Sequence, residues 1–230
     1  AINAGMGIGP TFAGLIIILK GYGMLFWIDG LTCILAVILF RHWVKPTKSV
    51  ITKINTETDT KDALTVYKDK TYWVFLGICF FFGMAFFQLI FTLPLYYEEI
   101  FGLNEFQIGL LMFLNVGIIV VFEMPLIGYL EKRLIPVVKH ITVACALLAL
   151  SYYVLFQNFW IAVLIISIII ITFSEMLGFP YTNKFALNRA KEGLEGSYMA
   201  LYTVAFSIAH IFGAKISLIV IDAYGYQINW

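Results

Sequence analysis

The sequence contains little charge and few residues of the kinds that bind metals or form disulfides. Charged residues make up 13% of its 230 positions, and it has 3 cysteines and 3 histidines. Cys33, Cys79 and Cys145 are odd in number, far apart, and each lies within an apolar segment. They therefore predict neither a disulfide framework nor a zinc site. The sequence has no HExxH motif, and we expect no metal and no other cofactor.

The basic residues form no continuous patch along the chain. The formal net charge is +1, and lysine and arginine are dispersed over the connections between apolar segments. A nucleic-acid interface needs such residues gathered on one face, so nucleic acid is not an expected partner. Residues 1–20 also lack the basic start and the small-residue cleavage site of a signal peptide. We expect this first segment to be a structural part of the protein.

Apolar residues, in contrast, are abundant and occur in long runs. They account for 61% of the chain. A helix of about 20 apolar residues crosses a bilayer of roughly 30 Å, and only helices and closed barrels satisfy their own backbone in lipid. The expected fold class is therefore all-α, a polytopic membrane protein whose partner is the lipid bilayer. The seven predicted spans are 1–20, 22–41, 72–97, 105–130, 136–156, 159–182 and 197–222.

The basic residues predict which ends of these spans face the cytoplasm. All 15 lysines and arginines except Lys20 and Lys215 lie at the connections after the second, fourth and sixth spans. The opposite connections, "YYEEIFGLNEF" and "FQNFW", contain none. The positive-inside rule places the basic connections in the cytoplasm, so the chain begins inside and ends outside. Heptahelical receptors have the opposite orientation, and we expect instead a multi-pass protein of the plasma membrane.

The polar segment divides the chain into unequal parts. Residues 42–71 mix lysine with acids and threonine, and they predict a solvated cytoplasmic linker, with a partner-binding segment as the alternative. The linker separates two spans (1–41) from five (72–230). An odd number of spans, an apolar start without methionine and an abrupt end predict that this is part of a longer protein.

The first span carries a pattern of small residues in "GMGIGPTFAG". Gly5, Gly9 and Ala13 repeat every four residues and share one helix face, where small side chains let another helix approach closely. Pro10 removes one backbone hydrogen bond and bends the helix, and Gly14 follows. Such a packing seam alone is common in polytopic proteins.

Together with its surroundings, this pattern resembles the fifth-helix signature of major facilitator superfamily antiporters, with alanine in place of one glycine. "GYLEKRLIPVVK" resembles the family's second cytoplasmic loop motif: Gly128 and Arg133 match, while the acid is displaced to Glu131. "SEMLGFP" and "GSYMALYTVAFSIAHIFG" resemble the tenth and eleventh helices. The resemblance implies helices five to eleven of a twelve-helix fold, with helices one to four and twelve outside this sequence. It also implies that the fifth helix packs against the eighth, between two halves that alternate in access.

Three ionisable residues inside the spans are candidates for proton coupling: Glu123, Glu175 and His210. A charge in the membrane interior costs about 2.5–3.5 kcal/mol or more, so it needs a partner, water or a function. The 1.5 Å rise per residue places both glutamates roughly 10 Å inside the cytoplasmic boundary and His210 near the midplane. Each has an alternative: Glu175 pairs with Arg133 in a cytoplasmic charge cluster, Glu123 contacts substrate, and His210 bonds to a neighbouring helix.

Further polar and aromatic residues predict a substrate pocket. An apolar cavity with a few polar anchors is the usual design of a small-molecule site. Packing against core or lipid is the alternative for each ring. The candidate lining residues are Phe87, Gln88, Phe91, Asn115 and Tyr202.

The function implied by the resemblance is secondary active transport. The antiporter signature and the sparse buried charge favour proton-coupled efflux of a small amphipathic or hydrophobic compound, so the expected partners are that small-molecule substrate and protons. The alternative function, on the same fold but in the opposite direction, is proton-coupled uptake of a sugar, peptide or organic acid. An intramembrane enzyme using Glu123, Glu175 and His210 is a third hypothesis, but no nucleophile or metal constellation supports it.

Overall fold

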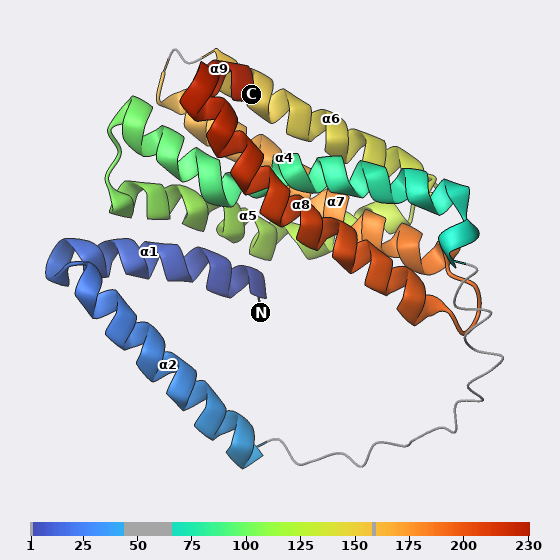
Figure 1. Cartoon of the computed structure of the whole chain (residues 1–230), viewed down its shortest axis with the longest axis horizontal. Coiled ribbons are helices and arrows are strands. Elements are labelled where there is room, and N and C mark those ends of the chain that lie inside the picture. The colour runs from blue at the N-terminus through green and yellow to red at the C-terminus, as the bar shows by residue number, and fades with distance from the viewer. Residues whose placement is uncertain (1, 44–65, 158–159) are drawn as a thin grey trace.

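The computed structural model describes residues 2–43, 66–157 and 160–230, and every regular element in these ranges is a helix (Figure 1). The predicted all-α fold is confirmed. The elements are α1 (Ile2–Lys20), α2 (Tyr22–Trp43), η1 (Val66–Lys68), α4 (Lys70–Phe101), α5 (Glu105–Glu131), α6 (Val137–Phe156), α7 (Ala162–Arg189), α8 (Glu195–Tyr224) and α9 (Tyr226–Asn229).

Within the described ranges, six helices are long and apolar enough to cross a membrane: α2, α4, α5, α6, α7 and α8. They correspond to the last six of the seven predicted spans. The first predicted span is the helix α1, which is not among these six. The predicted linker 42–71 overlaps α2, which ends at Trp43, and α4, which begins at Lys70. Its residues 44–65 lie outside the described ranges.

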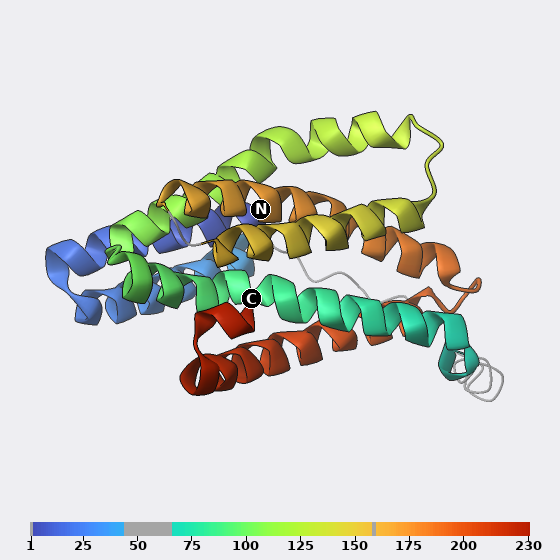
Figure 2. The same cartoon turned by 90° about the horizontal axis from the view of Figure 1, so that it is seen from above.

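The helices pack chiefly in three pairs: α6 with α7, α1 with α5, and α4 with α8 (Figures 1 and 2). Contacts of α7 with α5, α8 and α4 join the three pairs. α2 leads away from the other helices and has no buried residue among those described (Figure 1). The packing of α1 along α5 brings together the two helices that the family resemblance assigns to positions five and eight.

Rings from three helices form the centre of the core. Phe82 of α4, Phe179 of α7 and Phe206 of α8 meet there, with ring centroids 5.8 Å apart between Phe82 and Phe179 and 5.3 Å apart between Phe179 and Phe206. Edge-to-face and tilted aromatic contacts of this kind add to the free energy gained by burying the rings. This packing holds α8 against α4 and α7, which are two of the three helices that line the cavity described below.

A polar cluster joins the same three helices at the end predicted to face the cytoplasm. Asp69 caps the start of α4 by accepting a hydrogen bond from the backbone nitrogen of Tyr72 at 3.1 Å. Both carboxylate oxygens of Asp69 also accept from Arg189, the last residue of α7, at 2.8 and 2.9 Å. The hydroxyl of Tyr198 on α8 donates to the same carboxylate at 3.3 Å. The hydrogen bonds from Arg189 are the largest cause that lowers the pKa of Asp69, from 3.8 to about 2.

Replacing Asp69 with asparagine is expected to weaken this cluster without removing the cap. Asparagine caps helices as well as aspartate does, so only the partly exposed ion pair is lost, at a cost of about 0.5 kcal/mol. Because the pKa of Asp69 is lowered on folding, its contribution is present above its ordinary pKa and is lost as the pH falls through about 2. Asp69→Asn should therefore lower the thermal midpoint slightly near neutral pH. It should also make the thermal midpoint depend less on pH between 3.8, the ordinary pKa, and about 2, the lowered pKa.

Thermal unfolding in detergent over this acid range measures the effect. Asp69→Ala removes the cap as well and should cost about 1 kcal/mol more. Glu192→Gln, at an exposed loop residue, is the control. An acid dependence in Asp69→Asn as steep as that of the unmodified protein would contradict this account.

Candidate functional site

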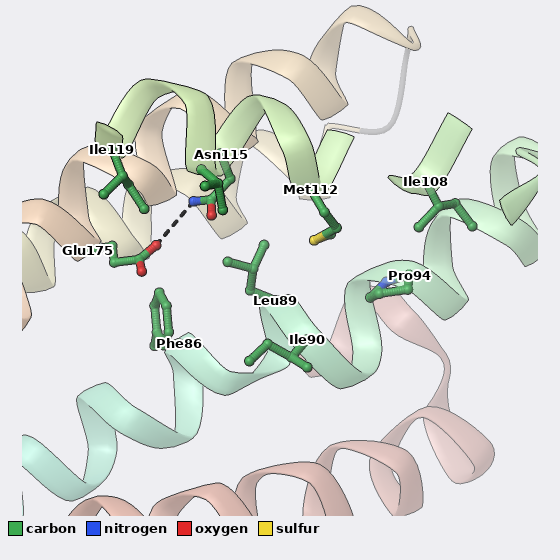
Figure 3. A pocket seen from close by; sticks show the side chains of 10 residues that line it. Phe86, Leu89, Ile90, Pro94, Ile108, Met112, Asn115, Ile119 and Glu175 are labelled. Carbon is green, nitrogen blue, oxygen red and sulfur yellow. Dashed lines mark hydrogen bonds between the residues drawn. The ribbon is translucent and has the colours of Figure 1, made fainter. Parts of the chain in front are cut away.

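A cavity of about 400 Å³ lies between α4, α5 and α7 (Figure 3). We call it the Glu175 hollow. Eight apolar residues and two polar ones line it: Phe86, Leu89, Ile90, Pro94, Ile108, Met112, Asn115, Val116, Ile119 and Glu175. Its volume lies in the range typical of small-molecule sites, which are mostly apolar with a few polar groups.

The polar wall of the Glu175 hollow is a short hydrogen-bonded chain between α5 and α7. The side-chain nitrogen of Asn115 donates to Glu175 Oε2 at 3.1 Å and to Thr172 Oγ1 at 2.9 Å. The Thr172 hydroxyl donates in turn to the Ile168 carbonyl at 2.6 Å. Because Thr172 and Glu175 are three residues apart on α7, they lie on one helix face and both reach the same amide. Asn115 therefore fixes the position of the carboxylate.

The wall formed by α4 contains an interruption of the helix. Pro94 has no backbone N–H, so it leaves the carbonyl of Ile90, four residues earlier, without its helical donor. Both residues line the Glu175 hollow. A proline inside a helix removes this one backbone hydrogen bond and favours a bend at that point.

A second cavity of about 410 Å³ continues from the first between α1, α4 and α5. The two share Pro94 and Ile108 in their linings. The second, which we call the outer vestibule, has Glu98 and Glu105 in its lining. The Tyr22 hydroxyl donates to Glu105 Oε1 at 3.2 Å. Both acids belong to the connection predicted to face outward, so the vestibule leads from the Glu175 hollow toward that side.

Two of the predicted site residues meet in the Glu175 hollow. Asn115, predicted to line the substrate pocket, and Glu175, predicted to carry protons, are hydrogen-bonded to each other. Glu123 on α5 is half-buried, is not in the lining, and forms no hydrogen bond or ion pair with the described residues. Glu123 nevertheless lies near enough to Glu175 for their charges to interact, whereas His210 packs against Phe87 and Phe91 on α4.

The other predicted pocket residues lie in three different environments. The rings of Phe87 and Phe91 on α4 pack against His210 of α8, with centroids 4.7 and 4.8 Å away. Gln88 Oε1 accepts a hydrogen bond from Asn229 of α9 at 2.7 Å. Tyr202 is buried, and its hydroxyl lies 3.0 Å from Thr182 Oγ1. None of these four predicted pocket residues lines the Glu175 hollow, but Phe91 lines the outer vestibule.

The pairing of Glu175 with Arg133, the alternative role predicted for Glu175, is not seen among the described residues. Arg133 hydrogen-bonds to Tyr129 on the preceding turn and lies 4.6 Å from the centroid of its ring. The ion pair that joins α5 to α7 is instead Lys184 with Glu131, at 2.8 Å. Gly128, the other loop-motif residue, has open space where a side chain would be.

The small-residue motif of α1 makes its closest described contact at Gly14. A Cβ atom added there would lie 2.7 Å from the backbone oxygen of Glu105, at the start of α5. A Cβ added to Gly9 would meet no atom within 4 Å. Gly5 and Pro10 are not among the residues whose side-chain environment the structure describes. The close approach of α1 to α5 is therefore at Gly14.

Sequence reasoning missed most of the lining residues, although their spacing contained a signal. Residues 86, 89, 90 and 94 recur at helical intervals on α4, and 108, 112, 115, 116 and 119 do so on α5. Each set therefore marks one helix face. Among the described residues, no three histidine, cysteine, aspartate or glutamate side chains gather in a way that could hold a metal ion.

Comparison with known proteins gives one family match. Residues 1–214 match the model of the Major Facilitator Superfamily. No curated protein and no solved structure matches the chain.

Proposed function

Since this chain belongs to the major facilitator superfamily and is a multi-pass membrane transporter of small molecules, we propose that it exports a small amphipathic or hydrophobic compound in exchange for protons. The site is the Glu175 hollow, and the membrane is the plasma membrane. The observation that carries this proposal is the composition of the hollow: eight apolar residues surround one carboxyl group and one amide.

The apolar walls favour a substrate with an apolar body. Burial of that body would be stabilised by about 25 cal/mol for each Å² removed from water. A polar metabolite such as a sugar would need several hydrogen-bonding partners, because each unpaired polar group in the cavity costs about 1–3 kcal/mol. The lining offers two polar side chains, Asn115 and Glu175, so the composition favours the amphipathic compound.

The carboxyl group of Glu175 is the proposed proton carrier. Its partner in the hollow is a neutral amide, and no basic side chain is part of the described lining. A carboxylate in such surroundings is costly to keep charged, so uptake of a proton or contact with a charged substrate group relieves that cost. Exposure to one side of the membrane and then to the other would convert this exchange into coupled transport.

Transport by the purified full chain in lipid vesicles tests the function. A pH gradient is imposed, and a panel of amphipathic fluorescent dyes is offered beside a panel of sugars, peptides and organic acids. We expect dye flux that depends on the gradient and stops when a protonophore collapses it. Gradient-driven accumulation of a polar metabolite without dye flux would replace efflux by uptake, and chemical turnover without any gradient would indicate an enzyme.

A further inference from the structure

The polar groups that line the Glu175 hollow identify a narrower substrate class. We propose that the hollow binds a protonated amine that carries at least one N–H on an apolar body, through hydrogen bonds to Glu175 and Asn115. This inference rests on the proposed function, because it names the substrate of that same site. It follows from three features of the lining: the donors already in use, the acceptors left over, and the charge along the adjoining vestibule.

The hydrogen-bond donors among the lining side chains are already hydrogen-bonded to other residues. Asn115 is the one lining side chain with N–H groups, and its nitrogen donates to Thr172 at 2.9 Å and to Glu175 at 3.1 Å. An amide nitrogen has two hydrogens, so these two bonds use both. While Glu175 is ionised, the side-chain donors in the described lining are thus all occupied, and a ligand that needs donors, such as a carboxylate or phosphate, finds none there.

Several acceptors, in contrast, are left without a described donor. Glu175 keeps its second carboxylate oxygen, and Asn115 keeps its carbonyl oxygen, because the bonds given above use neither. On α4 the carbonyl of Ile90 lacks a helical donor because of Pro94. Met112 adds a thioether sulfur, a weak acceptor, which points toward α4 in Figure 3. A ligand that donates is the one these groups satisfy.

The charge of the approach favours a cation as well. The outer vestibule contains Glu98 and Glu105, and neither cavity has a lysine, arginine or histidine in its lining. A cleft lined by charge of one sign concentrates ligands of the opposite sign. A cation moving between the vestibule and the hollow therefore meets carboxylates at both ends of its route.

Hydrogen bonding distinguishes this proposal from simple attraction of positive charge. A dimethylammonium group has one N–H to donate, whereas a trimethylammonium group has the same charge and none. Hydrogen bonds to charged groups typically contribute a factor of roughly 10 to 100 in affinity. We expect the dimethylammonium ligand to bind about tenfold more tightly than its trimethylammonium analogue.

Equilibrium binding to the full chain in detergent, without any gradient, measures this preference. The probes are (naphthylmethyl)dimethylammonium and (naphthylmethyl)trimethylammonium, with naphthylacetate as the anion. The Glu175→Gln variant keeps the shape of the side chain and its acceptor for Asn115, and it should bring the ratio of the two affinities close to one. Asn115→Leu should reduce the ratio too, and Glu192→Gln, at an exposed loop residue, should leave it unchanged.

Equal affinity for the two cations, or tighter binding of naphthylacetate, would overturn the inference. So would a tenfold preference that Glu175→Gln leaves intact, because the preference would then arise elsewhere. Coincident melting curves of the variants and the unmodified protein establish that each variant is folded. If the protein transports dye but binds the two cations equally, this inference is rejected and the proposed function stands. If it binds the dimethylammonium probe more tightly but shows no gradient-driven flux, the proposed function alone is rejected.

The ammonium group could belong to a free amine or to a lipid headgroup. Phosphatidylethanolamine has N–H groups and phosphatidylcholine has none, so the binding is repeated with each lipid added. Competition by neither lipid supports a free amine as the ligand. Competition by phosphatidylethanolamine alone supports the same donor chemistry from a lipid source, and equal competition by both lipids contradicts it.

Discussion

Replacing Glu175 with glutamine is expected to abolish proton-driven flux while leaving the protein folded. Glutamine has the same shape, and its side-chain oxygen can still accept from Asn115, now 3.1 Å from Glu175 Oε2. The amide cannot take up or release a proton, so the imposed pH gradient no longer drives transport. Initial rates of dye movement in vesicles should fall to those of protein-free vesicles, while the thermal midpoint stays within about 2–4 °C of the unmodified protein.

Two further variants make this result specific. Glu192→Gln removes a carboxylate from an exposed loop residue and should retain full flux. Glu123→Gln tests the other candidate acid, which lies on α5 outside the lining. If Glu123→Gln stops gradient-driven flux and Glu175→Gln does not, the proton carrier is Glu123, and the proposal for the Glu175 hollow is wrong.

Placing leucine at Gly14 is expected to disrupt the packing of α1 on α5. A Cβ atom there would lie 2.7 Å from the backbone oxygen of Glu105 and 2.9 Å from its carbonyl carbon. Backbone atoms cannot rotate away as a side chain does, so the two helices must separate. Overpacking of this kind costs about 1–3 kcal/mol. Gly14→Leu should lower the thermal midpoint by several degrees and slow transport in proportion.

Gly9 provides the matched control on the same helix. A Cβ added at Gly9 meets no atom within 4 Å, and alanine favours a helix over glycine by about 1 kcal/mol. Gly9→Ala should therefore be neutral or stabilising, whereas Gly14→Ala should already destabilise. Thermal unfolding and vesicle flux compare all three variants. Equal tolerance of alanine at both positions would show that the contact at Gly14 does not hold α1 in place.

The sequence predicted the helices because hydrophobic runs of membrane length leave few alternatives. It predicted the ends less well, since local caps rather than hydropathy determine them. α4 extends beyond the predicted 72–97 because Asp69 caps its start and Gly102, with a φ of 64°, ends it after Phe101. The capping box of Asn104 and Gln107 begins α5, and here the predicted start at 105 agrees with the structure.

The candidate site was only partly predictable, for a related reason. Asn115 and Glu175 stood out because polar residues are rare in apolar spans, and the structure places them in contact. The neighbours of Gln88 and His210 depend on how each helix is rotated, which weak amphipathicity leaves open. The partners Lys184 and Glu131 are 53 residues apart in the chain, and Arg189 and Asp69 are 120 apart, so spacing could not pair them.

The central claim is that substrate and proton share the carboxyl group of Glu175, and proton release on binding tests it most directly. The purified full chain is titrated with an amphipathic amine in weakly buffered detergent, and the pH is followed with an indicator. The account predicts that binding releases protons from the unmodified protein and releases none from Glu175→Gln. Equal release from both proteins, or binding without release from the unmodified protein, would contradict it.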